Sequence, residues 1–132
     1  MMLLDTNVLI HYLKGNPGIV AQMRNTPRRE LAIPAIVLYE LEYGTLRSKL
    51  PPLRRRELAA GLQHMRHIPF NSDAAIAAAR LRMDVEMRGL AIGPLDTLIA
   101  GTAVSRGAAL VTNNAAEFSR IPALRVIDWR SA

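Results

Sequence analysis

Acidic and amide side chains recur along this chain where an expected strand ends or an expected helix begins. Asp5 follows an apolar run, Asp96 lies in the first turn of an expected helix, and Asn114 follows a second apolar run. Glu117 comes shortly after Asn114, and Glu40 lies in the middle of another expected helix. Carboxylates gathered without Lys or Arg partners repel one another, and oxygen ligands without Cys or paired His favour a hard cation such as Mg²⁺ or Mn²⁺. Such a pocket in a basic protein suits phosphodiester hydrolysis.

Each of these residues also has a purely structural interpretation. Asp5 can cap the helix that follows it, Asp96 can interact with a helix dipole, and Asn114 is a typical turn residue. A Glu in the middle of a helix usually lies on a solvated face, so Glu40 reaches the other acids only if its helix leans over the same edge of the sheet. The joint pattern, rather than any single residue, favours a shared site.

The elements that would position these residues alternate between strands and helices. Short apolar runs predict strands, and apolar residues at helical spacing between capping and breaking residues predict helices. The expected strands cover 1–4, 31–33, 67–70, 108–112 and 126–127, and the expected helices cover 6–15, 19–24, 34–46, 53–65, 74–88 and 94–107, with a turn at 16–18. This order predicts an α/β fold of three layers, with a central, mainly parallel sheet between helices. Strand ends and helix starts share one edge of such a sheet, so the acids are expected to converge there.

Composition places further limits on the protein. A chain of 132 residues, 50% of them hydrophobic, is expected to form a single domain over 1–132. The formal charge of +6 rests on many Arg and only two Lys, which suits a polyanionic partner such as RNA, DNA or an acidic protein. The lack of Cys excludes disulfides and thiolate metal sites. No basic leader precedes the first apolar run, and no run approaches the length of about 18 residues that a membrane span needs, so we expect a cytoplasmic protein.

Other chemistries fit the sequence less well. It has no Walker loop or dinucleotide-binding glycine motif, and no serine in a G-x-S-x-G elbow. A haloacid-dehalogenase-like phosphotransferase also has an Asp after its first strand, but it needs a second Asp where this chain has Asn7. His64 and His67 lack an apparent third partner for a zinc site, so we expect them to be structural.

Four segments, in order and spanning the chain, resemble a PIN-domain ribonuclease, with the closest similarity to the VapC toxins of VapBC toxin–antitoxin pairs. They are Leu3-Leu4-Asp5-Thr6-Asn7, Glu40-Leu41-Glu42-Tyr43-Gly44, Ile92-Gly93-Pro94-Leu95-Asp96-Thr97-Leu98-Ile99-Ala100, and Leu110-Val111-Thr112-Asn113-Asn114 with Glu117-Phe118. The resemblance implies a toxic endoribonuclease that depends on Mg²⁺ or Mn²⁺ and uses metal-bound water to leave a 5′-phosphate and a 3′-hydroxyl.

The resemblance also implies roles for individual residues. Asp5 and Asp96 would be the principal metal ligands, and Glu40 would complete the acidic cluster directly or through water. Many PIN domains have Asp at the position of Asn114, which puts a second metal site in doubt, although Glu117 is a candidate replacement. Two further residues, Asn7 and Thr112, would orient the acids by hydrogen bonds.

The partners implied by the resemblance are an RNA substrate, a VapB antitoxin and a second copy of the chain in a homodimer. VapC proteins with Ile-Gly-Pro before the third acid include enzymes that cut initiator tRNA in its anticodon stem-loop, so tRNA is the expected substrate. Candidate phosphate contacts are basic residues outside the motifs, namely Arg47, Lys49, Arg54, Arg55, Arg56 and Arg88. Two alternatives stay open: a non-catalytic nucleic-acid-binding module, and a PIN-fold protein that has lost its activity.

Overall fold

Five parallel strands form one sheet in the order β3-β2-β1-β4-β5. In this computed structural model, which describes residues 1–131, the strands are β1 (Met2–Leu4), β2 (Leu31–Pro34), β3 (Arg66–Ile68), β4 (Ala109–Val111) and β5 (Val126–Ile127). The central strand, β1, pairs with β2 on one side and β4 on the other. Strand order therefore reverses at β1, and ligands bind beside such a reversal at the carboxyl ends of the strands.

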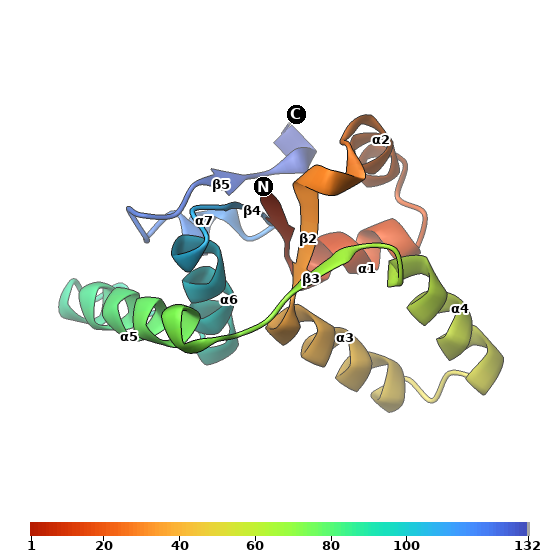
Figure 1. The fold of residues 1–132 in the computed structure, drawn as a ribbon, viewed down its shortest axis with the longest axis horizontal. Coiled ribbons are helices and arrows are strands. Elements are labelled where there is room, and N and C mark those ends of the chain that lie inside the picture. The colour runs from red at the N-terminus through yellow and green to blue at the C-terminus, as the bar shows by residue number, and fades with distance from the viewer. Residues whose placement is uncertain (132) are drawn as a thin grey trace.

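Helices cover both faces of the sheet. They are α1 (Thr6–Leu13), α2 (Pro17–Asn25), α3 (Ala35–Arg47), α4 (Pro52–Leu62), α5 (Ser72–Met87), α6 (Pro94–Ser105) and α7 (Ala115–Phe118), with short 3-10 turns at Arg28–Glu30 and Trp129–Ser131. In Figure 1, α1 and α2 lie on one side of the sheet and α5 and α6 on the other, while α3 and α4 extend from its carboxyl end. The predicted three-layer α/β fold is confirmed, and all its strands are parallel.

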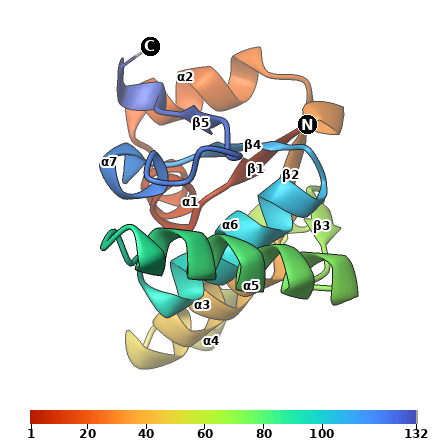
Figure 2. The same ribbon diagram turned by 90° about the vertical axis from the view of Figure 1, so that its left-hand side faces the viewer.

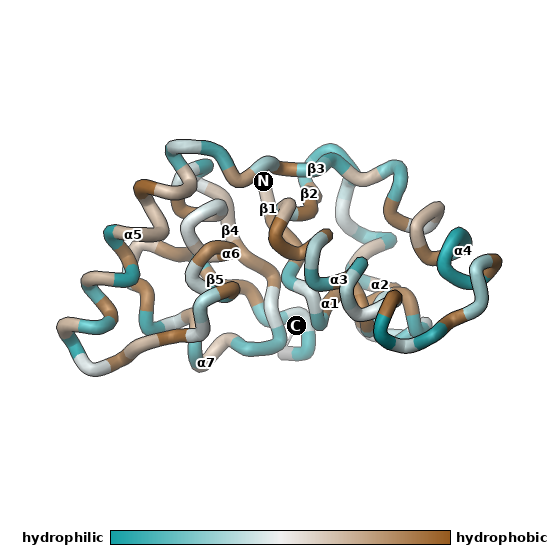
Figure 3. Tube along the Cα trace, turned by 90° about the horizontal axis from the view of Figure 1, so that it is seen from below, coloured by the Kyte–Doolittle hydropathy of each residue, from teal (hydrophilic) through white to brown (hydrophobic). Residues whose placement is uncertain are grey.

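The core lies where the central strands meet the helices. Leu3, Leu4, Ile33 and Leu110 are completely buried, because strands covered on both faces have no solvent side. Hydrophobic segments gather along the sheet and α6, whereas hydrophobic and hydrophilic stretches alternate along α4 (Figure 3). None of the helices within residues 1–131 is long and apolar enough to cross a membrane.

Helices α5 and α6 pack directly against each other, side by side, as Figure 2 shows. The contact is close because a small residue faces a small residue. A Cβ built on Gly101 of α6 would lie 2.5 Å from the Cβ and 2.8 Å from the backbone of Ala78 on α5. This separation leaves no space for a side chain at Gly101.

Some predicted boundaries are wrong. The segment 16–18 is the start of α2 rather than a turn, because Asn16 caps the helix by accepting a hydrogen bond from the Ile19 backbone and Pro17 fits its first turn. Helix α4 ends at Leu62, before the predicted residue 65, and β3 covers Arg66–Ile68 rather than 67–70. Helix α7 was not predicted.

Candidate active site

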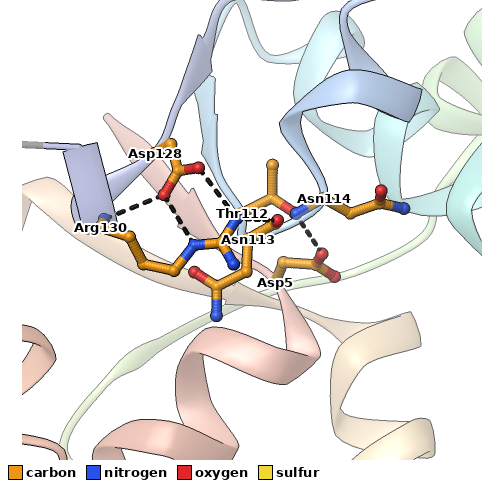
Figure 4. Close-up of polar contacts among 6 residues, drawn as sticks. All are labelled: Asp5, Thr112, Asn113, Asn114, Asp128 and Arg130. Carbon is orange, nitrogen blue, oxygen red and sulfur yellow. Dashed lines mark hydrogen bonds and ion pairs between the residues drawn. The ribbon is translucent and has the colours of Figure 1, made fainter.

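Asp5 lies at the carboxyl end of β1, beside the end of β4. Its backbone N–H donates to the carbonyl of Val111 at 2.9 Å. The side chain is buried, with 5% exposed, and both of its oxygens accept hydrogen bonds: Oδ1 from the Thr6 backbone at 2.8 Å and Oδ2 from the Thr112 hydroxyl at 2.7 Å. Figure 4 shows Asp5 and Thr112 facing each other from the ends of the two strands. The Asp5 carboxylate is therefore held in one orientation.

Glu40 reaches this site from α3. Its Oε1 accepts a hydrogen bond of 2.7 Å from the hydroxyl of Thr6, the residue whose backbone N–H binds Asp5. Thr6 thus connects the two carboxylates through one residue at the start of α1. The helix does lean over the carboxyl edge, as a shared site requires.

Asp96 and Glu117 both lie close to Gly93, the residue that precedes α6 as its N-cap. A Cβ on Gly93 would lie 3.7 Å from Asp96 Oδ2 and 3.9 Å from Glu117 Oε1. The Gly93 backbone N–H donates to Glu117 Oε1 at 2.9 Å, and the Asn114 side-chain amide donates to Glu117 Oε2 at 2.5 Å. Asn114 therefore acts as a donor that orients Glu117, which an ionised Asp at this position could not do.

These carboxylates influence each other electrostatically. Burial raises the pKa of Asp5 above its ordinary value, and the charge of Glu117 adds to this, against the lowering effect of hydrogen bonds from Thr112 and Thr6. Burial, followed by the charges of Asp5, Glu117 and Glu40, raises the pKa of Asp96 to about 7. The four acids therefore form one electrostatic cluster, in which the negative charges of the other three disfavour ionisation of Asp96.

Among residues 1–131, no Lys or Arg forms an ion pair with this cluster. The ion pairs among the described residues all lie elsewhere: Arg54–Glu57, Arg82–Glu86, Arg88–Asp84 and Arg130–Asp128. The last pair lies beside Asn113, whose carbonyl accepts a hydrogen bond from Arg130 (Figure 4). A cluster of carboxylates without cations is suited to a divalent metal ion.

The donor set fits a hard cation such as Mg²⁺ or Mn²⁺. The groups available are carboxylates, with the carboxamide of Asn114 nearby, and the chain has no Cys. Within the part of the chain that the structure describes, no three His, Asp or Glu side chains are close enough to hold one ion together. Mg²⁺ is commonly held by one or two carboxylates and retains several waters, so this spacing is compatible with it.

One predicted residue, Asn7, does not make the contact expected of it, and one contact in the site was not predicted. Asn7 is exposed, and among the described residues its side chain makes no hydrogen bond to the acids. The neighbouring Thr6 makes those contacts instead, because position 6 faces α3 while position 7 faces solvent. Sequence reasoning also missed Gly93 as a donor to Glu117. The backbone N–H groups at a helix N-terminus are free to donate, which could have pointed to Gly93. The acceptor could not be placed, because Glu117 lies on α7, a helix that was not predicted.

The PIN domain family profile matches residues 2–124 of the chain. This chain belongs to the PIN-domain family. Its VapC-type resemblance is also confirmed, because the "tRNA(fMet)-specific endonuclease VapC" of Salmonella typhimurium is 35% identical over 127 residues, 96% of each chain.

Two further similarities extend over nearly the whole PIN domain. The "Ribonuclease VapC2" of Rickettsia felis is 35% identical over 129 residues, again 96% of each chain. The crystal structure of VapBC2 from Rickettsia felis bound to a promoter DNA fragment superposes with a TM-score of 0.90 at 34% identity, covering 97% of this chain and 98% of that one. Both the sequence and the fold of this chain are thus of the VapC type.

Proposed function

We propose that this protein is a toxic endoribonuclease that depends on Mg²⁺ or Mn²⁺ and hydrolyses RNA phosphodiester bonds. The observation that carries the proposal is the cluster of Asp5, Glu40, Asp96 and Glu117 at the carboxyl edge of the sheet, without a neutralising cation among the described residues. The ribonuclease names of its VapC relatives support the same reaction.

Asp5 and Asp96 would hold the metal, with Glu40 in contact directly or through water. When bound, the ion would supply an activated water and would neutralise charge developing on the phosphate. The contribution of the chain is orientation: Thr112 and Thr6 fix the Asp5 carboxylate, and Thr6 also fixes Glu40. Carboxylates that are already aligned need no reorganisation when the substrate binds.

Glu117 would occupy the fourth acidic position. Hydrogen bonds from Gly93 and Asn114 fix its two oxygens, and its charge helps to raise the pKa of Asp96. The side chain therefore carries the negative charge that many PIN domains place at the position of Asn114. Products with a 5′-phosphate and a 3′-hydroxyl are expected from in-line hydrolysis at such a site.

The decisive test is an endonuclease assay on purified bulk tRNA and on an unstructured RNA, with Mg²⁺ or with a chelator. We expect discrete cleavage by the wild type with Mg²⁺, none with chelator, and none by Asp5→Asn, whose folding is checked by circular dichroism. If neither RNA is cut while both proteins bind RNA equally well, the protein is a binding module or an inactive PIN-fold protein.

Initiator tRNA, cut in its anticodon stem-loop, is the substrate we propose. Support comes from the Salmonella typhimurium relative, which is named for tRNA(fMet). Mapping the ends of the cleaved tRNA tests this choice. A single cut in the anticodon stem-loop of initiator tRNA is expected, and cuts spread over all tRNAs would contradict it.

A VapB-like antitoxin is the proposed protein partner, together with a second copy of the chain. The solved VapBC complexes support the antitoxin.

Between α1, α3 and α4 lies a groove of about 680 Å³ that is lined largely by apolar side chains. A smaller groove of about 340 Å³ beside it has Glu40 in its wall. An apolar segment would fit the larger groove, where its charged residues would meet Glu42, Arg55 and Arg56. In the smaller groove they would meet Glu40, Lys14 and Arg54. Co-expression with a VapB-like antitoxin is expected to relieve toxicity and yield a stable complex.

A further inference from the structure

One face of α3 carries two exposed aromatic rings and an Arg in a row. Tyr39 and Tyr43 are 57% and 52% exposed, and their rings are nearly parallel, with centroids 6.5 Å apart and an interplanar angle of 8°. The Arg47 guanidinium lies 5.8 Å from the centroid of the Tyr43 ring. We call these three residues the α3 ladder.

The ladder starts next to the acidic cluster. Tyr39 directly precedes Glu40, whose carboxylate accepts the Thr6 hydroxyl hydrogen bond in the cluster. At about 100° per residue around a helix, the Tyr43 position is turned about 60° from the Glu40 position and the Tyr39 position about 100°. The ladder then extends about 12 Å along the helix axis from Tyr39 to Arg47. It therefore forms a path that leads from the acids along α3.

We propose that the α3 ladder binds unpaired bases of the RNA substrate, next to the bond that is cut. This inference rests on the proposed ribonuclease function and adds the substrate feature that is recognised. Exposed aromatic rings beside cationic side chains are the usual platform for single-stranded nucleic acids, because every base has a face that can stack. A duplex, whose bases are already stacked, offers no such face.

Charge complementarity favours RNA over a protein surface as the occupant. Among the described residues Arg47 has no carboxylate partner, and its only side-chain hydrogen bond is a long one of 3.5 Å to the Tyr43 hydroxyl. Its guanidinium is thus available to a phosphate. Lys49 follows two residues after α3 ends, and the chain as a whole has a charge of +6. A phosphate of the RNA backbone next to a stacked base would lie close to Arg47 and Lys49.

The test measures RNA binding in chelator, where no cleavage is expected, for the wild type, Tyr39→Ala, Tyr43→Ala and Tyr43→Phe. Leu46→Ala is the matched control, because Leu46 is an exposed apolar residue (54%) on the same helix without a stacked ring. The probes are a short unstructured RNA containing 2-aminopurine, which loses emission when it stacks, and a blunt RNA duplex of equal length.

Each Tyr→Ala variant is expected to bind the unstructured RNA roughly fivefold to a hundredfold more weakly and to lose the fluorescence quenching. Tyr43→Phe and Leu46→Ala should bind within about twofold of the wild type, since a phenyl ring still stacks. Binding of the duplex should not change. Equal binding of the unstructured RNA by the Tyr→Ala variants and the wild type would overturn the proposal.

Two parallel measurements separate this proposal from its alternatives. Sedimentation of each variant shows whether the ladder is instead an interface between copies, since in that case Tyr→Ala would convert a dimer to a monomer and affect both RNAs alike. Cleavage by the wild type with Mg²⁺ tests the proposed function separately. Cleavage that persists unchanged in the Tyr→Ala variants overturns only the ladder, whereas absence of wild-type cleavage overturns the ribonuclease itself.

Discussion

Asp5 caps α1 and belongs to the acidic cluster at the same time. The sequence presented these roles as alternatives, but the structure joins them: Oδ1 accepts the Thr6 N–H of the helix and Oδ2 accepts the Thr112 hydroxyl. A helix cap on a buried strand end is a rigid support for a carboxylate. The Asp5 side chain can therefore cap α1 and also take part in the acidic cluster.

Thr112→Val should weaken both the fold and the reaction. The Thr112 hydroxyl is buried, donates to Asp5 and accepts from the Asn114 backbone at 2.9 Å, so its removal leaves polar groups without partners. We expect a loss of about 1–3 kcal/mol in the free energy of unfolding and roughly tenfold to hundredfold slower cleavage. Urea unfolding and the RNA assay measure these effects. Thr112→Ser keeps the hydroxyl and should retain most of the stability and most of the cleavage rate. A Thr112→Val variant as stable and as active as the wild type would contradict the role of this hydroxyl.

Asp96 should make the metal-free protein less stable as pH rises. Its pKa is raised from 3.8 to about 7 on folding, so the folded state favours the protonated acid. The resulting stabilisation is complete below about pH 4 and is lost as pH rises to about 7. In chelator, the melting temperature of the wild type should therefore fall relative to Asp96→Asn over this range, and added Mg²⁺ should reverse the fall at pH 7.5. A difference that stays constant with pH would contradict the raised pKa.

At the scale of elements, the close packing of α5 on α6 sets the position of Asp96. Asp96 lies in the first turn of α6, and Gly101 further along the same helix meets Ala78 of α5. The helix cannot move away from α5 without disturbing the acid that it carries. Small residues at this crossing therefore contribute to the site from a distance.

Gly101→Ala should destabilise the protein, although Ala favours helices more than Gly does. The added Cβ would lie 2.8 Å from Ala78 backbone atoms, and overpacking of this kind costs about 1–3 kcal/mol. Gly44→Ala on α3 is the matched control, because nothing lies within 4 Å of its Cβ, and it should be stabilising by up to about 1 kcal/mol. Thermal unfolding of both variants measures the contrast, and an equally stable Gly101→Ala would show that the helices can separate.

The sequence predicted most elements but not all of their boundaries. Buried strands such as Leu31-Ala32-Ile33 are predictable because uninterrupted apolar runs fit a sheet covered on both faces. Helix α7 escaped prediction because four residues, Ala115–Phe118, are too few to show a periodic pattern. Its Glu117 was nevertheless a candidate from the family motif. What the sequence could not supply was the contact from Gly93, which is distant along the chain and orients Glu117 together with Asn114.

At the scale of the whole molecule, the site is assembled from four separate parts of the chain. Parallel strands bring Asp5 and Thr112 to one edge, and this convergence was predictable from the alternation of strands and helices. The approach of Glu40 was not, because it depends on the direction in which α3 leaves β2. Sequence motifs therefore identified the acids, and packing brings all four to the same edge of the sheet, where the other three influence the ionisation of Asp96.

The most direct test of this assembly is the rate of RNA cleavage as a function of Mn²⁺ concentration for the wild type, Asp5→Asn and Asp73→Asn. Asp73 is an exposed acid of α5, so its replacement changes net charge equally without touching the cluster. We predict that the wild type and Asp73→Asn reach the same rate at saturating Mn²⁺ and are inactive in chelator, and that Asp5→Asn is at least about a hundredfold slower. Cleavage that persists in chelator, or at an unchanged rate in Asp5→Asn, would contradict a metal-dependent site built on these carboxylates.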